Sequence, residues 1–426
     1  MIEKRIRKRK KVLIITYYWP PAGGSGVQRW LFFVKYFRRY GIEPVVYTAG
    51  GAAYPVIDEK LEKHVPPGIT VLRGRIWEPG NFIRKAQEQG AGMLPGNPGM
   101  WQRFLTYVRA NYFVPDARKF WIKPSVRFLK EYLKEHPVDM IVSTGPPHST
   151  HVIARNLKRK TGIRWLADFR DPWTDIDYFH KLPLTPVNYA RHRKLESTVL
   201  SEANVVTVVS EEMRKKYLPY NKNCHVITNG FDGEVVPPEP YTGKYFVMTH
   251  SGTLNADRNH EIFWEALREL IDEVPGFGKH LRLKMIGNTA PEVKRSIRRH
   301  ELTGYVEITD YLPYDEMEKV LSGSAVLLLF VNRVPGAKGI LTGKIFEYLR
   351  SGKPVLAIAP QGGDLERIIK QTNCGILVDF EDKRQLKKGI LEYYHAFTGG
   401  KLIAATAGVE RYARENLTHI MSKLLQ

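Results

Sequence analysis

The sequence predicts an α/β protein with two doubly wound, parallel-sheet domains. Short runs of Val, Ile and Leu alternate along the chain with segments in which apolar residues recur at helical spacing. The length of 426 residues is enough for two or three domains. A stretch rich in proline and glycine at residues 230–243 divides the alternation into two halves. Strand–helix alternation of this kind is typical of a Rossmann-like winding in each half.

The first half opens with an apolar run at residues 12–18, which prolines and a glycine-rich loop end at residues 20–26. Apolar residues then recur at helical spacing from Val27 to Phe37, and Gly41 follows as a candidate C-cap. Later strands of this half are expected at residues 44–48, 140–143, 165–168, 205–209 and 225–228. We therefore assign residues 1–235 to an N-terminal domain.

The second half repeats the pattern. Strands are expected at residues 245–249, 281–286, 306–308, 326–330, 355–358 and 375–378, and helices at residues 259–273, 291–301, 314–321 and 383–394. Residues 236–415 are assigned to a C-terminal domain, and residues 416–426 to a helix that packs back on the N-terminal domain. Two such domains are expected to face each other across a cleft and to bind ligands at the carboxyl ends of their strands.

Residues 80–130 do not fit a simple winding and are predicted to form a helical insertion. Trp101, Phe104 and Tyr112 lie on one helical stripe, and Trp121 follows among basic residues. Aromatic side chains beside Lys and Arg are typical of a membrane interface. An insertion that packs on its own domain explains the pattern equally well, so both interpretations stay open.

The charge of the chain restricts its partners. The net charge is +21, with basic residues clustered before the first strand and between residues 103 and 130. This surplus favours a polyanion such as an acidic glycan or anionic lipid, although a solvated surface is the alternative. Nucleic acid is not an expected partner, because no zinc finger, aromatic RNA-binding signature or helix-turn-helix is recognisable.

The cysteine content and the hydropathy of the chain indicate in which cellular compartment the protein is expected. Cys224 and Cys374 are too few and too far apart for a disulfide framework or a zinc site, which favours buried thiols in a reduced compartment. Residues 12–18 are too short for a signal peptide, and no stretch nears the roughly 18 apolar residues of a membrane-spanning helix. We expect a cytoplasmic protein.

The segment at residues 338–359 carries the strongest functional pattern. A loop with Gly339, Thr342 and Gly343 opens a short helix that carries Glu347, and a buried strand follows. Unpaired amides at the start of a helix suit a phosphate, and a carboxylate just beyond can accept hydrogen bonds from a ribose. The layout therefore suits a sugar nucleotide, although an ordinary loop–helix–strand unit with an exposed Glu gives the same pattern.

Two loops of the first half are further candidates. Gly23 and Gly24 would allow a ligand to approach the backbone, but Arg29 stands where the third glycine of a dinucleotide fingerprint belongs, so turn geometry is the alternative. His148 comes just after the strand at residues 140–143, where it could face a ligand or act as a capping or surface residue. His151, one turn further, is expected on the helix surface.

Two acids end another predicted strand. Asp168 and Asp171 could reach the ligand and orient an acceptor hydroxyl or a substrate amine. The alternative is a turn-forming role before Pro172.

Taken in order, these motifs resemble those of the family-4 glycosyltransferases of the GT-B fold, over almost the whole chain. The motifs are the loop at 20–26, Thr-Asn-Gly-Phe-Asp at 228–232, Ser-Gly-Thr-Leu at 251–254, Ile-Gly at 286–287, Asp-Tyr-Leu-Pro at 310–313 and the segment 339–355. The resemblance implies two Rossmann-like domains, with the acceptor held by the N-terminal domain and a UDP- or GDP-linked sugar by the C-terminal one. It also implies retention of anomeric configuration, no cofactor and no essential metal.

The donor residues follow from the same resemblance. Glu347 matches the second Glu of the family's E-x7-E motif, which binds the ribose, whereas Gly339 replaces the first Glu. Backbone amides near Leu341 and Thr342 are implied to hold the diphosphate.

Two cations usually meet the diphosphate in this family. Arg258 matches the position of the family's Lys, but Thr253 stands where an Arg is usual. We infer that Lys344 or Lys338 supplies the missing charge.

In the N-terminal domain, His148 resembles the family's histidine near the donor sugar, and Gly23 and Gly24 match the loop near the donor phosphate and the acceptor. Asp171 joins His148 and Arg258 as a catalytic candidate. With the charge and the aromatic insertion, these matches suggest a glycan or lipid-linked acceptor at the inner membrane face, in polysaccharide or glycolipid synthesis.

Two rival functions remain. One is another GT-B activity, such as a nucleotide-sugar epimerase or a glycogen-type or sucrose-type synthase. The other is a catalytically inactive GT-B scaffold that binds glycan or protein partners, for which Gly339 is the main support. Glu347, His148 and Arg258 argue against the scaffold.

Overall fold

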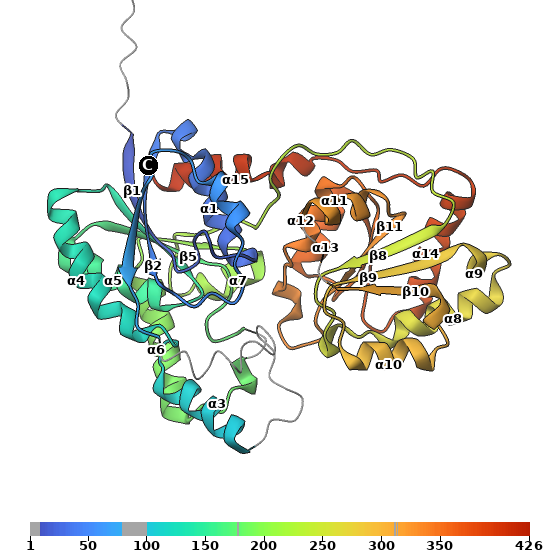
Figure 1. The fold of residues 1–426 in the computed structure, drawn as a ribbon, viewed down its shortest axis with the longest axis horizontal. Helices are drawn as coiled ribbons and strands as arrows, with labels where there is room; N and C mark the ends of the chain where they lie inside the picture. The colour runs from blue at the N-terminus through green and yellow to red at the C-terminus, as the bar shows by residue number, and fades with distance from the viewer. Residues whose placement is uncertain (1–8, 79–99, 177–178, 311, 313) are drawn as a thin grey trace, which may run out of the picture. The chain divides into compact units, whose positions relative to one another are not determined.

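The computed structural model describes residues 9–78, 100–176, 179–310, 312 and 314–426. They divide into two compact units (Figure 1). Unit 1 runs to Asn229 and also includes Arg414–Gln426, whereas unit 2 comprises Gly230–Ala413. The sequence predicts the two corresponding borders slightly later in the chain, after residues 235 and 415. Within each unit all the paired strands are parallel, which confirms the predicted pair of doubly wound α/β domains.

Unit 1 is built on a seven-stranded sheet. In spatial order its strands are β3 (Thr70–Arg75), β2 (Ile42–Gly50), β1 (Lys10–Ile15), β4 (Met140–Gly145), β5 (Arg164–Phe169), β6 (Val205–Val208) and β7 (Cys224–Val226). Its helices are α1 (Ser25–Phe37), α3 (Met100–Tyr112), α4 (Lys119–Glu135), α5 (Ser149–Thr161), α6 (Pro186–Glu202), α7 (Glu211–Tyr217) and α15 (Arg414–Leu424). Residues 1–8, which hold much of the basic N-terminus, and residues 79–99, which include the first part of the predicted insertion, lie outside the described part of the chain.

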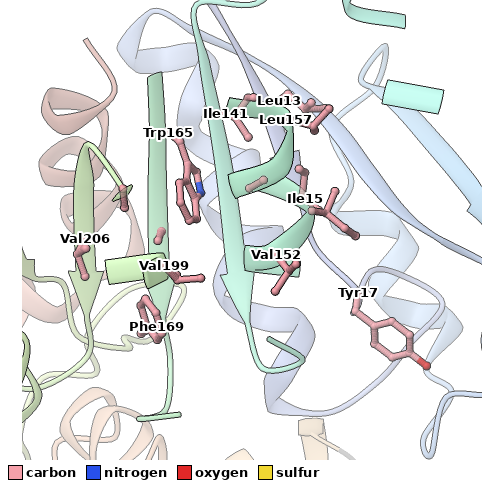
Figure 2. Close-up of a cluster of buried hydrophobic side chains, with 14 of the residues drawn as sticks. Leu13, Ile15, Tyr17, Ile141, Val152, Leu157, Trp165, Phe169, Val199 and Val206 are labelled. Atoms are coloured by element: carbon pink, nitrogen blue, oxygen red, sulfur yellow. The ribbon is translucent and has the colours of Figure 1, made fainter. Parts of the chain in front are cut away.

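Helices cover both faces of this sheet (Figure 1). One apolar cluster joins the sheet to α4, α5, α6 and α7, and Figure 2 shows part of it, including Trp165 and Phe169 of β5. A second cluster joins the other face to α1 and α15. Because both faces are buried, the inner strands read as continuous apolar runs rather than as alternating patterns.

Unit 2 repeats the design with six strands. In spatial order they are β10 (Val306–Thr309), β9 (Leu281–Ile286), β8 (Phe246–Ser251), β11 (Val326–Phe330), β12 (Val355–Ile358) and β13 (Gly375–Val378). Its helices are α8 (Glu261–Glu273), α9 (Phe277–His280), α10 (Pro291–Arg299), α11 (Tyr314–Ser322), α12 (Lys344–Arg350), α13 (Asp364–Thr372) and α14 (Lys383–Thr398). Apolar clusters again lie on both faces, one with α8, α10 and α14 and the other with α12 and α13.

Three further features bear on the predictions. Cys224 and Cys374 are both buried free thiols. No helix in the described ranges is long and apolar enough to span a bilayer. Residues 311 and 313 of the Asp-Tyr-Leu-Pro motif lie outside the described residues.

Candidate functional site

The strand order of unit 1 indicates which edge of its sheet would bind a ligand. The winding reverses between β1 and β4, which are neighbours in the sheet. In sheets of this type, ligands bind outside the carboxyl ends of the strands at the point of reversal. The loop after β1 holds Gly23 and Gly24, and the loop after β4 leads to His148, so the topology brings these predicted residues to one edge.

Local packing accounts for both glycines. The Gly23 amide donates a hydrogen bond to the Val56 carbonyl at 2.8 Å, and a Cβ at residue 23 would lie only 2.9 Å from the Val56 side chain. Gly24 has a φ of 83°, in the region that favours glycine, and directly precedes α1. Turn geometry alone therefore explains both residues, and their role near a ligand stays a prediction.

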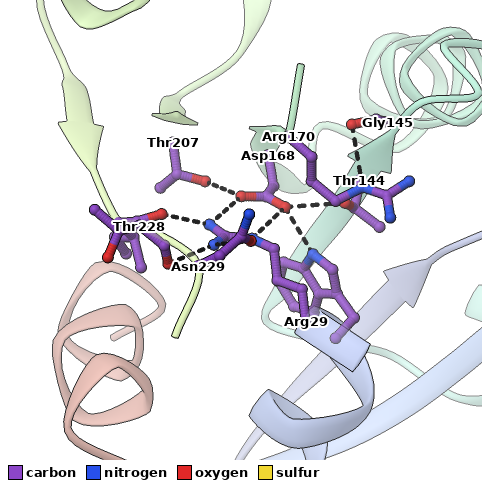
Figure 3. A network of polar contacts seen from close by, with 10 residues as sticks. Arg29, Thr144, Gly145, Asp168, Arg170, Thr207, Thr228 and Asn229 are labelled. Atoms are coloured by element: carbon purple, nitrogen blue, oxygen red, sulfur yellow. Dashed lines mark hydrogen bonds and ion pairs between the residues drawn. The ribbon is translucent and has the colours of Figure 1, made fainter. Parts of the chain in front are cut away.

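Asp168 does not face a ligand, contrary to the expectation from its place at a strand end. Its carboxylate is fully buried and accepts hydrogen bonds from Arg29, Trp30, Thr144 and Thr207 at 2.7–3.2 Å (Figure 3). Burial alone would raise the pKa of Asp168, but the Arg29 charge and these hydrogen bonds outweigh it and lower the pKa. The side chain is saturated with donors and is structural.

Arg29 explains why the dinucleotide fingerprint is incomplete. Its guanidinium pairs with Asp168 and also donates to the carbonyl oxygens of Ile227 at 2.8 Å and Thr228 at 2.7 Å (Figure 3). A glycine at this position would leave these carbonyls and the buried carboxylate without their cation. The arginine therefore fixes the segment that leads out of unit 1.

Arg170, which the sequence analysis did not select, joins the loops at this edge. Its guanidinium donates to the carbonyl oxygen of Gly26 at 2.5 Å, to that of Gly145 at 3.3 Å and to that of Pro146. The glycine loop and the His148 loop are thus held together by one side chain. Asp171 follows directly and is half-buried at the same edge, where it remains a candidate.

His148 occupies the N-cap position of α5, yet its side chain makes no capping hydrogen bond. Its ring stacks on Trp173 with centroids 4.3 Å apart, and its buried Nδ1 has no partner among the described residues. Burial, aided by the nearby charges of His151, His192 and Arg170, lowers the pKa of His148 well below its usual value. The imidazole is therefore neutral at pH 7 and suits hydrogen bonding to an uncharged group better than acid catalysis.

His151 is buried, which contradicts its expected place on the helix surface. The side chain has no solvent exposure, and its Nδ1 lies 2.8 Å from the Ser143 hydroxyl. Burial lowers its pKa to about 3. Because His151 is three residues after His148, both rings lie on the same inward face of α5.

In unit 2 the winding reverses between β8 and β11. Arg258 lies in the loop after β8, and its guanidinium donates to the Asn332 side chain at 2.6 Å and to the Thr253 carbonyl at 2.8 Å. Asn332 follows β11, so the hydrogen bond joins the two loops at the point of reversal. The structure thus places the predicted cation Arg258 where a ligand of this sheet would bind.

The Ser-Gly and Ile-Gly motifs are adjacent at this edge. Gly252 and Gly287 have φ angles of 87° and 110°, and a Cβ at residue 287 would lie 2.9 Å from the Gly252 carbonyl carbon. A Cβ at Gly252 would in turn lie 2.7 Å from Lys344 Cε. Gly252 therefore leaves the room that the Lys344 side chain fills.

Lys344 is the second cation of this edge. Its Nζ lies 3.2 Å from His250 Nε2, and Lys338, the other candidate, is exposed. Burial, together with the charge of Arg258, lowers the pKa of Lys344 to about 7. The amine is therefore close to half-protonated at neutral pH.

The glycine loop leads directly to Lys344. No described group accepts a hydrogen bond from the amides of Leu341 and Thr342, and Thr342 Oγ1 is buried without a described partner. The Leu341 side chain packs into the apolar core. Glu347 is half-buried in the first turn of α12, which spans only seven residues, so side chains and loop amides count for more here than a helix dipole.

Family models match both units. The model described as Glycosyltransferase Family 4 matches residues 24–235, and the model described as Glycosyl transferases group 1 matches residues 245–396. The chain belongs to the family-4 glycosyltransferases. No curated protein sequence matches it.

Solved structures agree with the GT-B fold of this glycosyltransferase. A sucrose-phosphate synthase from Thermosynechococcus elongatus has a TM-score of 0.60 at 16% identity, with 98% of each chain covered. TarM has a TM-score of 0.65 at 11% identity, with 98% of this chain and 99% of TarM covered. WaaG, a glycosyltransferase involved in lipopolysaccharide biosynthesis, has a TM-score of 0.55 at 13% identity, with 96% and 99% covered.

The aromatic insertion of the glycosyltransferase is only partly as expected. Trp121 is fully buried, with its ring stacked on Tyr47 at 5.4 Å, because α4 packs on the sheet. Tyr112 and Phe120 are instead exposed, at 61% and 37%, and so is Trp77, at 63%, which precedes the predicted insertion. Trp77 and Phe120 are in contact, and Lys119 Nζ lies 3.5 Å from the centre of the Tyr112 ring. We call these three side chains the aromatic surface.

Proposed function

We propose that this enzyme transfers a sugar, with retention of configuration, from a UDP- or GDP-linked donor to a glycan or lipid-linked acceptor in cell-surface polysaccharide or glycolipid synthesis. The observation that carries the proposal is the pair of cations, Arg258 and Lys344, at the carboxyl edge of unit 2 in a chain of this family. Two cations and free loop amides suit a diphosphate leaving group. TarM, solved with UDP and alpha-GlcNAc-glycerol, supports nucleotide-sugar chemistry on this fold.

In the proposed reaction, the bond between the sugar anomeric carbon and the diphosphate oxygen breaks as the acceptor oxygen bonds to that carbon. The acceptor attacks from the face where the diphosphate leaves, and the departing diphosphate oxygen takes the acceptor proton. Arg258, Lys344 and the amides of Leu341 and Thr342 meet the charge on the diphosphate, so we expect turnover without added divalent metal. Glu347 accepts hydrogen bonds from the ribose hydroxyls.

Residues of unit 1 serve the acceptor and the sugar. His148, which is neutral and whose Nδ1 has no partner among the described residues, orients the donor sugar rather than acting as a nucleophile. Asp171 orients the acceptor hydroxyl. Gly23 and Gly24 lie near the donor phosphate and the acceptor, and the basic surface of the chain draws the enzyme to the inner face of a membrane.

The test is calorimetric titration of Glu347→Ala with the nucleoside diphosphate that a thermal-shift screen of UDP, GDP and ADP selects. Hydrogen bonds to a charged group contribute about 1.5–3 kcal/mol each. Loss of two should weaken binding by at least tenfold, since about 1.4 kcal/mol corresponds to each factor of ten. Glu381→Ala, a matched exposed carboxylate in unit 2, should bind as the wild type does. Unchanged affinity in folded Glu347→Ala would contradict the donor assignment.

The two rivals separate in product analysis. Epimer formation from a nucleotide sugar without acceptor would indicate an epimerase. Binding of glycan with neither hydrolysis nor transfer would indicate the inactive scaffold, which Gly339 in place of the first motif Glu favours.

A further inference from the structure

Among the residues that the structure describes, Lys344 is a cation without an anion. Its only described hydrogen-bonding partner is His250, and the charge that acts on its pKa, that of Arg258, is also positive. No described carboxylate forms an ion pair with it. An enclosed ammonium beside a second cation is costly unless an anion compensates both.

His250 fixes how Lys344 is held. The imidazole is fully buried, its ring stacks on Phe330, and its Nδ1 lies 3.1 Å from the Leu328 carbonyl oxygen. Because a carbonyl only accepts, Nδ1 must carry the proton, and Nε2 is left as an acceptor for Lys344. Burial and the charge of Lys344 lower the pKa of His250 well below its usual value, so His250 stays neutral and the titrating group of the pair is the lysine.

In the described part of the chain, few other ionisable groups face this amine. From β8 and its loop they are His250 and Arg258. On its own helix, Tyr348 turns its hydroxyl to Ser251 and the Leu328 carbonyl, and burial raises its pKa, so it stays neutral. Glu347 lies three residues further along α12, and the loop after β11 contributes the uncharged Asn332.

We propose that a nucleotide sugar binds to this site together with a proton, which Lys344 takes up from solvent as the diphosphate comes to lie against it. The amine is partly neutral in the empty site, with its lone pair free, and becomes a full ammonium in the complex. It still donates one hydrogen bond to His250 Nε2, which leaves two N–H groups for diphosphate oxygens. This inference rests on the donor site proposed above and adds that donor binding is coupled to pH.

The direction of the effect follows from linkage. In the empty site the pKa of Lys344 is about 7, and a bound diphosphate raises it. Below pH 7 the lysine is already charged, so affinity is constant and no proton is taken up. Above pH 7 the affinity falls by up to about tenfold per pH unit, until the pH passes the pKa of the complex.

The experiment is isothermal titration of the full chain with UDP-glucose, UDP-N-acetylglucosamine and GDP-mannose at pH 6.0, 7.0, 8.0 and 8.5. Nucleotide sugars are chosen because the terminal phosphate of a free nucleoside diphosphate titrates near pH 6 and would add its own protons. Titration in two buffers of different ionisation enthalpy gives the number of protons taken up. We expect close to zero at pH 6.0 and a value approaching one at pH 8.0.

Three variants separate Lys344 from other groups. Lys344→Arg keeps a cation that does not deprotonate in this range, so it should bind without proton uptake and with a flat pH profile. Lys344→Met should bind at least tenfold more weakly at pH 6.0 and also without uptake. Lys338→Met, which removes the exposed lysine of the same loop, should keep both the uptake and the pH profile of the wild type.

The outcomes are distinct. Binding of a nucleotide sugar with no proton uptake at pH 8.0, or uptake that persists in Lys344→Arg, would overturn the inference and leave the proposed function standing. If none of the three sugars binds to folded protein at any pH, the donor assignment fails and the inference falls with it.

Discussion

Asp168 and Asp171 stand three residues apart, one near the end of β5 and the other just after it, yet their surroundings give them different roles. Asp168 turns back into the unit, where Arg29 and three further side chains donate to it. Asp171 lies beyond the strand and keeps partial contact with solvent. The sequence gives both acids the same pattern. Only the position of Arg29, far away in the chain, distinguishes them.

At His148 we expect loss of transfer with little loss of donor binding. His148→Ala removes the neutral imidazole that is proposed to orient the sugar, whereas the diphosphate cations lie in unit 2. His148→Phe is the matched variant, because it keeps a ring to stack on Trp173 but has no nitrogen. Both variants should lose at least 100-fold in turnover, on the order expected for a positioned polar group, and should titrate with nucleoside diphosphate as the wild type does. Wild-type turnover in His148→Phe would reduce the residue to a packing role.

The residues that sequence analysis found and those it missed differ in a physical way. Arg258 and His148 stand in loops that follow strand ends, and Glu347 stands on α12 in a local sequence motif, so all three could be selected from nearby residues alone. Arg170 and His250 act through residues remote in the chain, since Arg170 bonds the Gly26 carbonyl and His250 holds Lys344. Such partners become visible only when the sheet brings distant loops together. A basic residue in the Asp-Phe-Arg-Asp-Pro turn was the one local signal for Arg170.

Among the elements, α15 shows how a short terminal helix can complete a remote core. It packs on α1, and Leu417, Met421 and Leu425 enter the same apolar cluster as β1. Met421→Ala should therefore lower the free energy of unfolding of unit 1 by about 2–5 kcal/mol, the usual range for truncating a buried Met. Ile420→Ala, at the neighbouring 46% exposed position, should cost no more than about 0.5 kcal/mol. Urea unfolding followed by the tryptophan fluorescence of unit 1 measures both, and equal effects would contradict this packing.

Element prediction succeeded where both faces are buried. The inner strands β1, β4, β5, β8, β11 and β12 are apolar runs that sequence patterning places within about two or three residues of their ends. β3 was missed because it is an edge strand with half-exposed, partly charged residues, so that it lacks an apolar run. For α4 the sequence left two interpretations open, a membrane-facing helix and an insertion packed on its own domain. Trp121 and Leu129 turn inward and the charges of α4 cover its outer side, as the second interpretation expects.

For the whole molecule, the order of motifs was more informative than any single motif. Each unit has its own point of reversal. The loops of Gly23, His148, Arg258 and Leu341 follow the strands on either side of these points, whereas Asp171 follows β5, one strand further out. This regularity let a linker and two alternating patterns predict the fold class. The choice of sugar, acceptor and linkage depends instead on a few side chains that have no fixed spacing in the sequence. One example is the side chain that takes over the role of the first motif Glu, where this chain has Gly339. Chain-wide patterning therefore predicts the fold and the general chemistry but not the specificity.

The net charge of +21 is also a property of the whole chain, and it predicts binding to anionic bilayers. Each basic residue near an anionic surface contributes about 1 kcal/mol, and the aromatic surface of Trp77, Tyr112 and Phe120 can enter the interface. Sedimentation with vesicles rich in phosphatidylglycerol should show binding that weakens steeply from 50 to 500 mM salt. Salt screens the attraction between the protein and the lipid charges, which at 0.1 M ionic strength reaches only about 10 Å. Deletion of residues 1–9 should weaken the binding. Alanine at the three aromatic positions should remove the part of the binding that persists at high salt. Neither change should end transfer to an acceptor in solution. Phosphatidylcholine vesicles are the control. Folded protein that stays unbound at low salt would show that this charge has no role at a membrane.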